Sequence, residues 1–253
     1  MYARPGLAGS DFMIVRLGLV GYPLVGGALW AWTPLGVFDA LVLAALLELI
    51  PCFTIAQLRR VPEGDVPRIS LYYSSAVAIA GVGGISLTAG LARGGWGSLG
   101  FGPVPWLQVV GWSIGVLALS RVLAPLGVRL RHRLGVEETS LLLSILPKSP
   151  TERRAFAGLS LVAGFGEEIA YRGYAITTLG LAFGSIPLAV VASSAAFGVL
   201  HTYQGWIGIV RTGTLGAILA AIFLISDSVW PPIAVHASLD LWAGLVIGDR
   251  FLK

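Results

Sequence analysis

The sequence predicts an all-α, polytopic membrane protein with about eight transmembrane helices. Of its 253 residues, 56% are hydrophobic and only 12% are charged, and the mean hydropathy is +0.83. Soluble domains carry about 25% charged residues, so this chain has too few polar side chains to cover a water-exposed surface. The apolar runs are long and unbroken rather than alternating at every second residue, and this pattern indicates helices instead of a barrel. Helices also satisfy the backbone hydrogen bonds that lipid cannot.

Each predicted span is an apolar stretch of about 20 residues, the length that crosses a bilayer as a helix. In order, the spans are 12–34, 40–58, 69–91, 105–128, 155–179, 181–203, 206–226 and 230–247. The first span lacks the basic segment and the small-residue cleavage site of a signal peptide, so we expect it to be retained. Pro231 and Pro232 suit the first turn of a helix, so we expect the eighth helix to begin there, below the outer surface. Together the spans form a single membrane domain over residues 1–253.

The basic residues mark the loops on one side of the membrane. They lie between the second and third spans, between the fourth and fifth spans, and in the C-terminal tail: Arg59, Arg60, Arg68, Arg129, Arg131, Arg133, Lys148, Arg153, Arg154, Arg250 and Lys253. With eight spans these segments all face the same side, which predicts a multi-pass protein of the cell membrane with both termini in the cytoplasm. No basic cluster is interleaved with aromatic residues, so the net charge of +4 does not indicate a nucleic-acid partner. The lipid bilayer is the expected surrounding.

The connection between the fourth and fifth spans, residues 129–154, is the only long polar one. Within it, Glu137 and Glu138 come before a leucine-rich run that ends at Leu146. This pattern predicts a short helix over residues 136–146, either lying on the inner membrane surface or forming an ordinary loop helix.

Ionisable side chains in the last four spans are the strongest functional signal. Such groups are costly at bilayer depth, so they indicate a functional site unless they serve packing. The fifth span contains Glu167, Glu168 and Arg172, the sixth ends with Phe197 and His201, and the eighth contains His236 and Asp240.

Helical spacing separates the roles of these residues. Glu168 and Arg172 are four residues apart, so they share a face and can form an ion pair. Glu167 is rotated by about 100° from Glu168, so the two carboxylates cannot do the same task. The pairs Phe197 with His201 and His236 with Asp240 also share a face.

A carboxylate and two imidazoles in a low-dielectric cavity can hydrolyse a peptide bond. The carboxylate and one imidazole could orient and deprotonate a water, while the other imidazole and a short polar side chain could donate hydrogen bonds to the oxyanion. The same set could instead hold a metal ion that activates the water. The competing structural interpretation is an ion pair that joins helices and histidines that bridge them.

Three motifs, in this order, resemble those of the CPBP intramembrane protease family, which includes the type II CAAX prenyl endopeptidases and bacteriocin-processing proteins. They are Glu167-Glu168-x-x-x-Arg172, Phe197-x-x-x-His201 and His236-x-x-x-Asp240. The resemblance covers about residues 155–247. It implies that Glu167 and His201 activate the water, that His236 and Asp240 stabilise the oxyanion, and that Glu168 and Arg172 support the site.

Asp240 departs from the pattern of the prenyl endopeptidases, which typically carry Asn there. An ionised Asp would repel an oxyanion, so Asp240 must be protonated, must orient His236, or must bind a metal. The family has been described both as metal-dependent and as a metal-free glutamate type. Two possibilities therefore remain open: a zinc ion bound by Glu167, His201 and His236, or no cofactor at all.

The expected function is an intramembrane endopeptidase that acts on a membrane-associated or lipidated peptide. A prenylated substrate does not follow from the motifs. The alternative is a non-catalytic scaffold or immunity protein of the same fold, although such a protein has no need for the glutamates and histidines. A proton-coupled transporter would use buried carboxylates too, but it normally shows related halves, and the sequence has no internal repeat.

Overall fold

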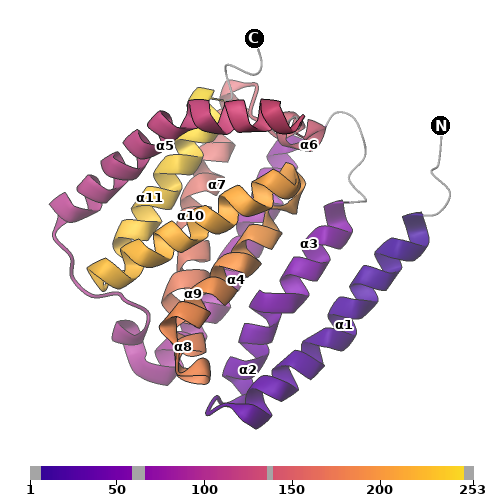
Figure 1. The fold of residues 1–253 in the computed structure, drawn as a ribbon, viewed down its shortest axis with the longest axis vertical. Helices are drawn as coiled ribbons and strands as arrows, with labels where there is room; N and C mark the ends of the chain where they lie inside the picture. Colours follow the sequence, from indigo (N-terminus) through magenta and orange to yellow (C-terminus); the bar gives the residue numbers. More distant parts are fainter. Residues whose placement is uncertain (1–6, 59–65, 136–138, 248–253) are drawn as a thin grey trace. The chain divides into compact units, whose positions relative to one another are not determined.

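The computed structural model describes residues 7–58, 66–135 and 139–247, and within these ranges it contains helices and turns but no strand (Figure 1). The all-α class is therefore confirmed. The chain forms two compact units: Met1–Glu63 with Tyr174–Ile218, and Gly64–Gly173 with Leu219–Lys253. The single membrane domain over residues 1–253 remains a prediction.

The first unit is built on an N-terminal helical hairpin. Helix α1 (Leu7–Trp32) packs along a second, continuous helical segment made of α2 (Val37–Ala44), the π-helical η1 (Ala45–Leu49) and α3 (Ile50–Leu58). The wider turn of η1 ends two residues before Pro51, whose ring and missing N–H do not fit a regular α-helix. The unit is completed by α8 (Thr177–Phe183), α9 (Ile186–Leu200), η3 (Thr202–Gln204) and the first part of α10 (Gly205–Ser226). The hydroxyl of Tyr174 donates a hydrogen bond to Asp39 Oδ1 (2.7 Å) and ties the two segments of the unit together.

The second unit has α7 (Pro150–Glu168) at its centre. Helices α4 (Arg68–Ser98) and α11 (Trp230–Trp242) pack against α7, and α5 (Trp106–Leu134) packs against α11. The π-helical η2 (Ile169–Ile176) continues α7, and η4 (Ala243–Ile247) continues α11. The short α6 (Ser140–Ser144) precedes α7, and the Tyr72 hydroxyl donates to the carbonyl of Ile145 (2.5 Å), which holds this connection against α4.

A capping box fixes the start of α7. The hydroxyl of Ser149 accepts a hydrogen bond from the Glu152 N–H (3.2 Å), and Glu152 Oε2 accepts from the N–H groups of Lys148 (2.7 Å) and Ser149 (2.9 Å). These backbone donors hold the pKa of Glu152 below its usual range, and Arg68, 3.6 Å away, acts in the same direction. The sequence Ser149-Pro-Thr-Glu152 therefore explains why the helix begins at this point.

All eight predicted spans fall on helices, but the count of eight remains a prediction. Five helical segments of the described chain are long and apolar enough to cross a membrane: Met13–Trp32, Val37–Gln57, Arg68–Ser98, Trp106–Leu134 and Thr202–Ser226. The others are shorter or more polar: α9 has 15 residues, α11 has 13, and α7 begins with charged residues. The eighth helix does begin at Trp230 with prolines in its first turn, as predicted.

The predicted boundary between the fifth and sixth spans is wrong. We predicted a break at residue 180, whereas the helix runs on to Phe183 and the next one begins at Ile186. Gly184 takes a left-handed conformation (φ 61°), which ends α8, and the Ser185 hydroxyl caps α9. The sixth predicted span extends to residue 203, but α9 ends at Leu200 and His201 is its C-terminal cap.

The orientation was predicted partly from Arg59, Arg60, Arg250 and Lys253, and these residues lie outside the described ranges. Cytoplasmic termini and the cell membrane as location therefore remain predictions. The helix predicted over residues 136–146 is represented by α6, which is shorter and is capped by the Thr139 side chain. Glu137 and Glu138 of that prediction lie outside the described residues.

Candidate active site

Three glycines let α7 approach its neighbours at the level of the predicted site. A Cβ atom on Gly166 would lie 2.9 Å from the carbonyl oxygen of Ile79 on α4, and one on Gly83 would lie 2.7 Å from the Cα of Gly166. On the opposite side of α7, a Cβ on Gly164 would lie 2.9 Å from the Cβ of Ala237 on α11. Since small residues allow such close packing between membrane helices, α7 is clamped between α4 and α11 directly before its two glutamates.

The predicted ion pair is confirmed. Arg172 Nη1 donates to Glu168 Oε1 at 2.7 Å, and both side chains are buried, with 1% and 0% of their surface exposed. Arg172 lies in the π-helical η2, which the sequence did not predict. Such π-helical turns occur frequently at functional sites, because they displace side chains from their regular α-helical positions.

Glu168 also holds His236, a residue from α11. His236 Nδ1 lies 2.7 Å from the same Oε1 atom that accepts from Arg172. An ionised carboxylate only accepts hydrogen bonds, so Nδ1 carries a proton, and Nε2 is the nitrogen that gains or loses a proton when the imidazole changes its charge. Arg172, Glu168 and His236 thus form one buried hydrogen-bonded chain that fixes which nitrogen of His236 faces the remaining carboxyls.

Glu167 and Asp240 both face His236 Nε2. Glu167 Oε2 lies 3.8 Å from this nitrogen and Asp240 Oδ2 lies 3.6 Å from it, so neither makes a direct hydrogen bond. Oε2 of Glu167 is buried and has no hydrogen-bond partner among the described residues. The Asp240 side chain is 40% exposed, against 15% for Glu167, so the site is most open on the Asp240 side.

The charges of this cluster do not balance. Three carboxyls, those of Glu167, Glu168 and Asp240, accompany one guanidinium and one imidazole. Even with the imidazole protonated, ionisation of all three would leave one more negative than positive charge in a low-dielectric surrounding, which is costly. The cluster can therefore take up and pass on a proton, as general acid–base chemistry requires.

His201 belongs to the other unit, so its predicted convergence with Glu167 remains a prediction. Its Nδ1 atom lies 2.9 Å from the carbonyl oxygen of Phe197, and its ring lies 5.0 Å from the Phe197 ring and 5.8 Å from the Tyr203 ring. The shared face of Phe197 and His201 is thus confirmed. Donation from Nδ1 to the carbonyl makes Nε2 the acceptor nitrogen, as in His236.

Glu168, and not Asp240, makes the hydrogen bond with Nδ1 of His236, a contact between residues 68 positions apart that no local sequence pattern indicates. The role of Asp240, 3.6 Å from Nε2, remains a prediction. Within the described ranges, no group of three or more His, Cys, Asp or Glu side chains is arranged to hold a metal ion. The zinc site of Glu167, His201 and His236 therefore remains a prediction.

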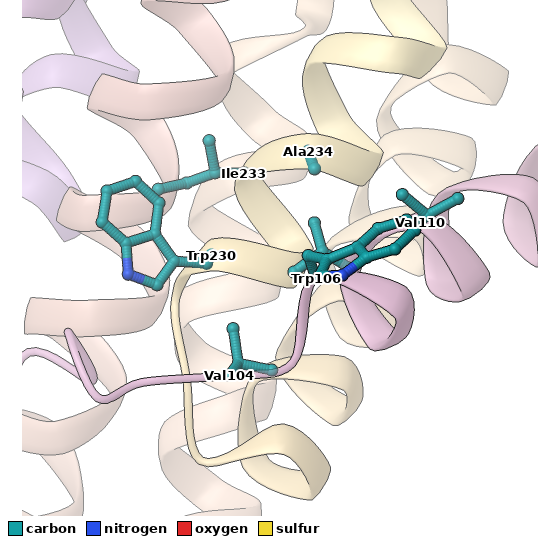
Figure 2. A pocket seen from close by; sticks show the side chains of 7 residues that line it. Val104, Trp106, Val110, Trp230, Ile233 and Ala234 are labelled. Atoms are coloured by element: carbon teal, nitrogen blue, oxygen red, sulfur yellow. The ribbon is translucent and has the colours of Figure 1, made fainter.

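An apolar groove of about 400 Å³ lies at the first turn of α11. It is lined by Val104, Trp106, Val109, Val110, Trp230, Ile233 and Ala234. Figure 2 shows the indoles of Trp106 and Trp230 on either side of Val104. None of the polar site residues lines the groove, but Ile233 precedes His236 by three residues on the same helix, so the groove is about one helical turn from the site along α11.

Comparison with known proteins gives one match. No curated protein and no solved structure matches the chain. A family model described as Rce1-like, type II CAAX prenyl endopeptidase, matches residues 150–242, rather more than a third of the chain. All six predicted site residues, from Glu167 to Asp240, lie inside the matched segment. The match agrees with the resemblance that the three motifs carry: residues 150–242 are similar to the Rce1-like type II CAAX prenyl endopeptidases, a family of membrane proteases.

Proposed function

We propose that this protein is an intramembrane endopeptidase that hydrolyses a peptide bond of a membrane-associated peptide with a water activated by Glu167. The single observation that supports this role best is the buried Oε2 atom of Glu167, which has no hydrogen-bond partner in the described chain and faces His236 Nε2 at 3.8 Å. A carboxylate held in this way is ready to accept a proton from a water bound beside it. The family match supports proteolysis in general and leaves the residue roles to be tested.

The proposed reaction uses the cluster as follows. Glu167 takes a proton from the water, and the hydroxide oxygen forms a bond with the carbonyl carbon of the scissile peptide. His236, protonated on both nitrogens, donates from Nε2 to the oxyanion while Glu168 stabilises the imidazolium through Nδ1. Glu167 then passes its proton to the leaving amine as the C–N bond breaks, and water resets the site.

Two residues complete this proposal from the family resemblance. His201 assists Glu167 in orienting the water. Asp240, 3.6 Å from His236 Nε2, bears a proton during the reaction and donates the second hydrogen bond to the oxyanion. A protonated carboxyl at position 240 would do what an Asn amide does in the prenyl endopeptidases.

The test is cleavage by purified protein in proteoliposomes, with a panel of quenched-fluorescence membrane peptides. The panel includes one CAAX peptide in farnesylated and unmodified form, so that the lipid requirement is read separately from cleavage. Glu167→Gln should abolish cleavage. Glu48→Gln is the matched control, because Glu48 is also a carboxylate with a buried, unpartnered oxygen in a membrane helix but lies outside the motifs, in the other unit.

The competing function is a non-catalytic scaffold or immunity protein. It would be favoured if the wild-type protein cleaved no peptide of the panel and a cellular phenotype of the protein survived Glu167→Gln. Equal cleavage by wild type and Glu167→Gln would instead refute the catalytic role of Glu167 while leaving the protease assignment in place.

A further inference from the structure

The C-terminal third of α5 is unusual among the long helices, because it has little protein around it. Every residue from position 121 to position 130 is exposed. The helix has 29 residues, about 43 Å at 1.5 Å per residue, whereas the hydrocarbon layer is about 30 Å thick. A helix of this length must tilt strongly or leave the hydrocarbon before it ends.

Pro125 divides α5 into two parts. A proline inside a helix removes one backbone hydrogen bond and bends the helix, and Figure 1 shows α5 as a bent helix. Before this point, the guanidinium of Arg121 lies over the Trp242 ring, 5.3 Å from its centroid, which fixes the first part of α5 on α11. The last turns, beyond Pro125, are therefore the part that can lie in the headgroup layer.

These last turns are strongly basic. Helix α5 contains no acidic residue, and four of its five cationic or titratable side chains follow Pro125, namely Arg129, Arg131, His132 and Arg133. Three of these, with Val128, line a groove of about 310 Å³. The lining positions 128, 129, 132 and 133 belong to one face of the helix, because residues three and four apart are neighbours there.

The same face continues into apolar residues toward the hydrocarbon. Val122 and Leu126 are 73% and 61% exposed, and they lead to Arg129 and Arg133 by steps of three and four residues. The surface of the groove is almost entirely apolar, but the side chains that form it include two arginines, which also carry cationic ends. An apolar groove with guanidinium groups on its lining side chains, continued by an exposed apolar strip, matches one kind of molecule, whose anionic headgroup is joined to acyl chains.

We propose that the groove formed by Val128, Arg129, His132 and Arg133 binds an anionic phospholipid. The guanidinium groups of Arg129 and Arg133 hold its phosphate, which their planar donor geometry suits, and the acyl chains lie along Val122 and Leu126. A free phosphate would use only the cationic part of this surface. This site is separate from the proposed protease activity and is tested without it.

The experiment is native mass spectrometry of the full-length protein in mild detergent, with equal concentrations of palmitoyl-oleoyl phosphatidylglycerol (POPG) and the corresponding phosphatidylcholine. The wild-type protein should retain POPG preferentially. Arg129→Gln/Arg133→Gln should retain roughly tenfold less POPG, since each basic residue near a membrane surface contributes substantially to such binding. Arg93→Gln/Arg154→Gln, which removes the same charge outside the groove, should retain as much as wild type.

Val128→Trp provides a second, uncharged test, because it fills the groove without changing the net charge and should also lower POPG retention. It serves as the deciding variant if Arg129→Gln/Arg133→Gln does not fold. Equal losses in both double variants, no lipid preference in the wild type, or complete displacement of POPG by inorganic phosphate at the same concentration would each overturn the proposal.

Discussion

The Nδ1 atom of His236 lies 2.7 Å from Oε1 of Glu168, the oxygen that also accepts a hydrogen bond from Arg172. Because this contact occupies Nδ1, the other ring nitrogen must face Glu167 and Asp240. We therefore predict that Glu168 acts as a positioning residue rather than a second base, so that the two adjacent glutamates have different tasks.

The variant Glu168→Gln should lose both stability and activity. It leaves the buried Arg172 guanidinium without its opposite charge, and breaking a buried ion pair costs about 3–5 kcal/mol. In the double variant Glu168→Gln/Arg172→Met both charges of the pair are removed together, so the thermal unfolding temperature should recover, while kcat stays low because His236 has lost its ionised partner. Thermal unfolding in detergent and peptide cleavage measure the two effects separately. A double variant as unstable as Glu168→Gln would contradict this account.

Asp240→Asn should keep cleavage within about tenfold of wild type, whereas Asp240→Ala should lower kcat by about a hundredfold or more, the range for loss of one oxyanion donor. The amide of Asn can donate a hydrogen bond to an oxyanion, as the protonated carboxyl of Asp240 is proposed to do. The measurement is kcat and KM for one peptide with all three proteins. If Asp240→Asn is as inactive as Glu167→Gln, the carboxyl itself is needed, as an acid or as a ligand.

Local spacing in the sequence was enough to predict the Glu168–Arg172 pair and the shared face of Phe197 and His201, because four residues make about one helical turn. It could not predict that His236 would meet Glu168, since this contact depends on how closely α11 packs on α7. Gly164 permits that approach, but a single glycine in an apolar helix does not by itself indicate which neighbour it faces.

The sequence contains the signals of a helix boundary at Gly184, but our prediction placed the boundary at a different residue. Gly184-Ser185, followed by Pro187, is a typical end and start of two helices. The apolar run continues through it, so an assignment based on span length placed the break elsewhere. The π-helical η2 is different in kind: its sequence has no local marker, and its widened turn can be seen only in the structure.

Alanine at Gly166 should destabilise the protein, and alanine at Gly158 should not. The new methyl group on Gly166 would press on the Ile79 backbone at 2.9 Å, and such overpacking costs about 1–3 kcal/mol. Gly158 lies on the same helix with no atom within 4 Å of an added Cβ, so its replacement should stabilise α7 by up to about 1 kcal/mol. Thermal unfolding of the two variants against wild type tests this directly. Equal shifts would show that α7 is not clamped at Gly166.

The capping box of α7 predicts a pH-dependent contribution to stability. Hydrogen bonds from the backbone N–H groups of Lys148 and Ser149 hold the pKa of Glu152 below its usual range. A carboxyl whose pKa is lower in the folded state stabilises the fold above its unfolded pKa, and this stabilisation is lost as the pH falls through the folded pKa. Glu152→Ala should therefore lower the free energy of unfolding at pH 7 by about 1 kcal/mol, and its unfolding temperature should be lower than that of wild type. This difference should shrink on acidification.

Thr151→Ala is the matched control for this measurement, because Thr151 is exposed in the same helical turn and takes no part in the capping box. Its unfolding temperature should differ from wild type by the same small amount at every pH. If Glu152→Ala also shows a constant difference from neutral to acidic pH, the ionised carboxylate does not stabilise the start of α7. The backbone groups of Lys148 and Ser149 would then have equally good partners in water.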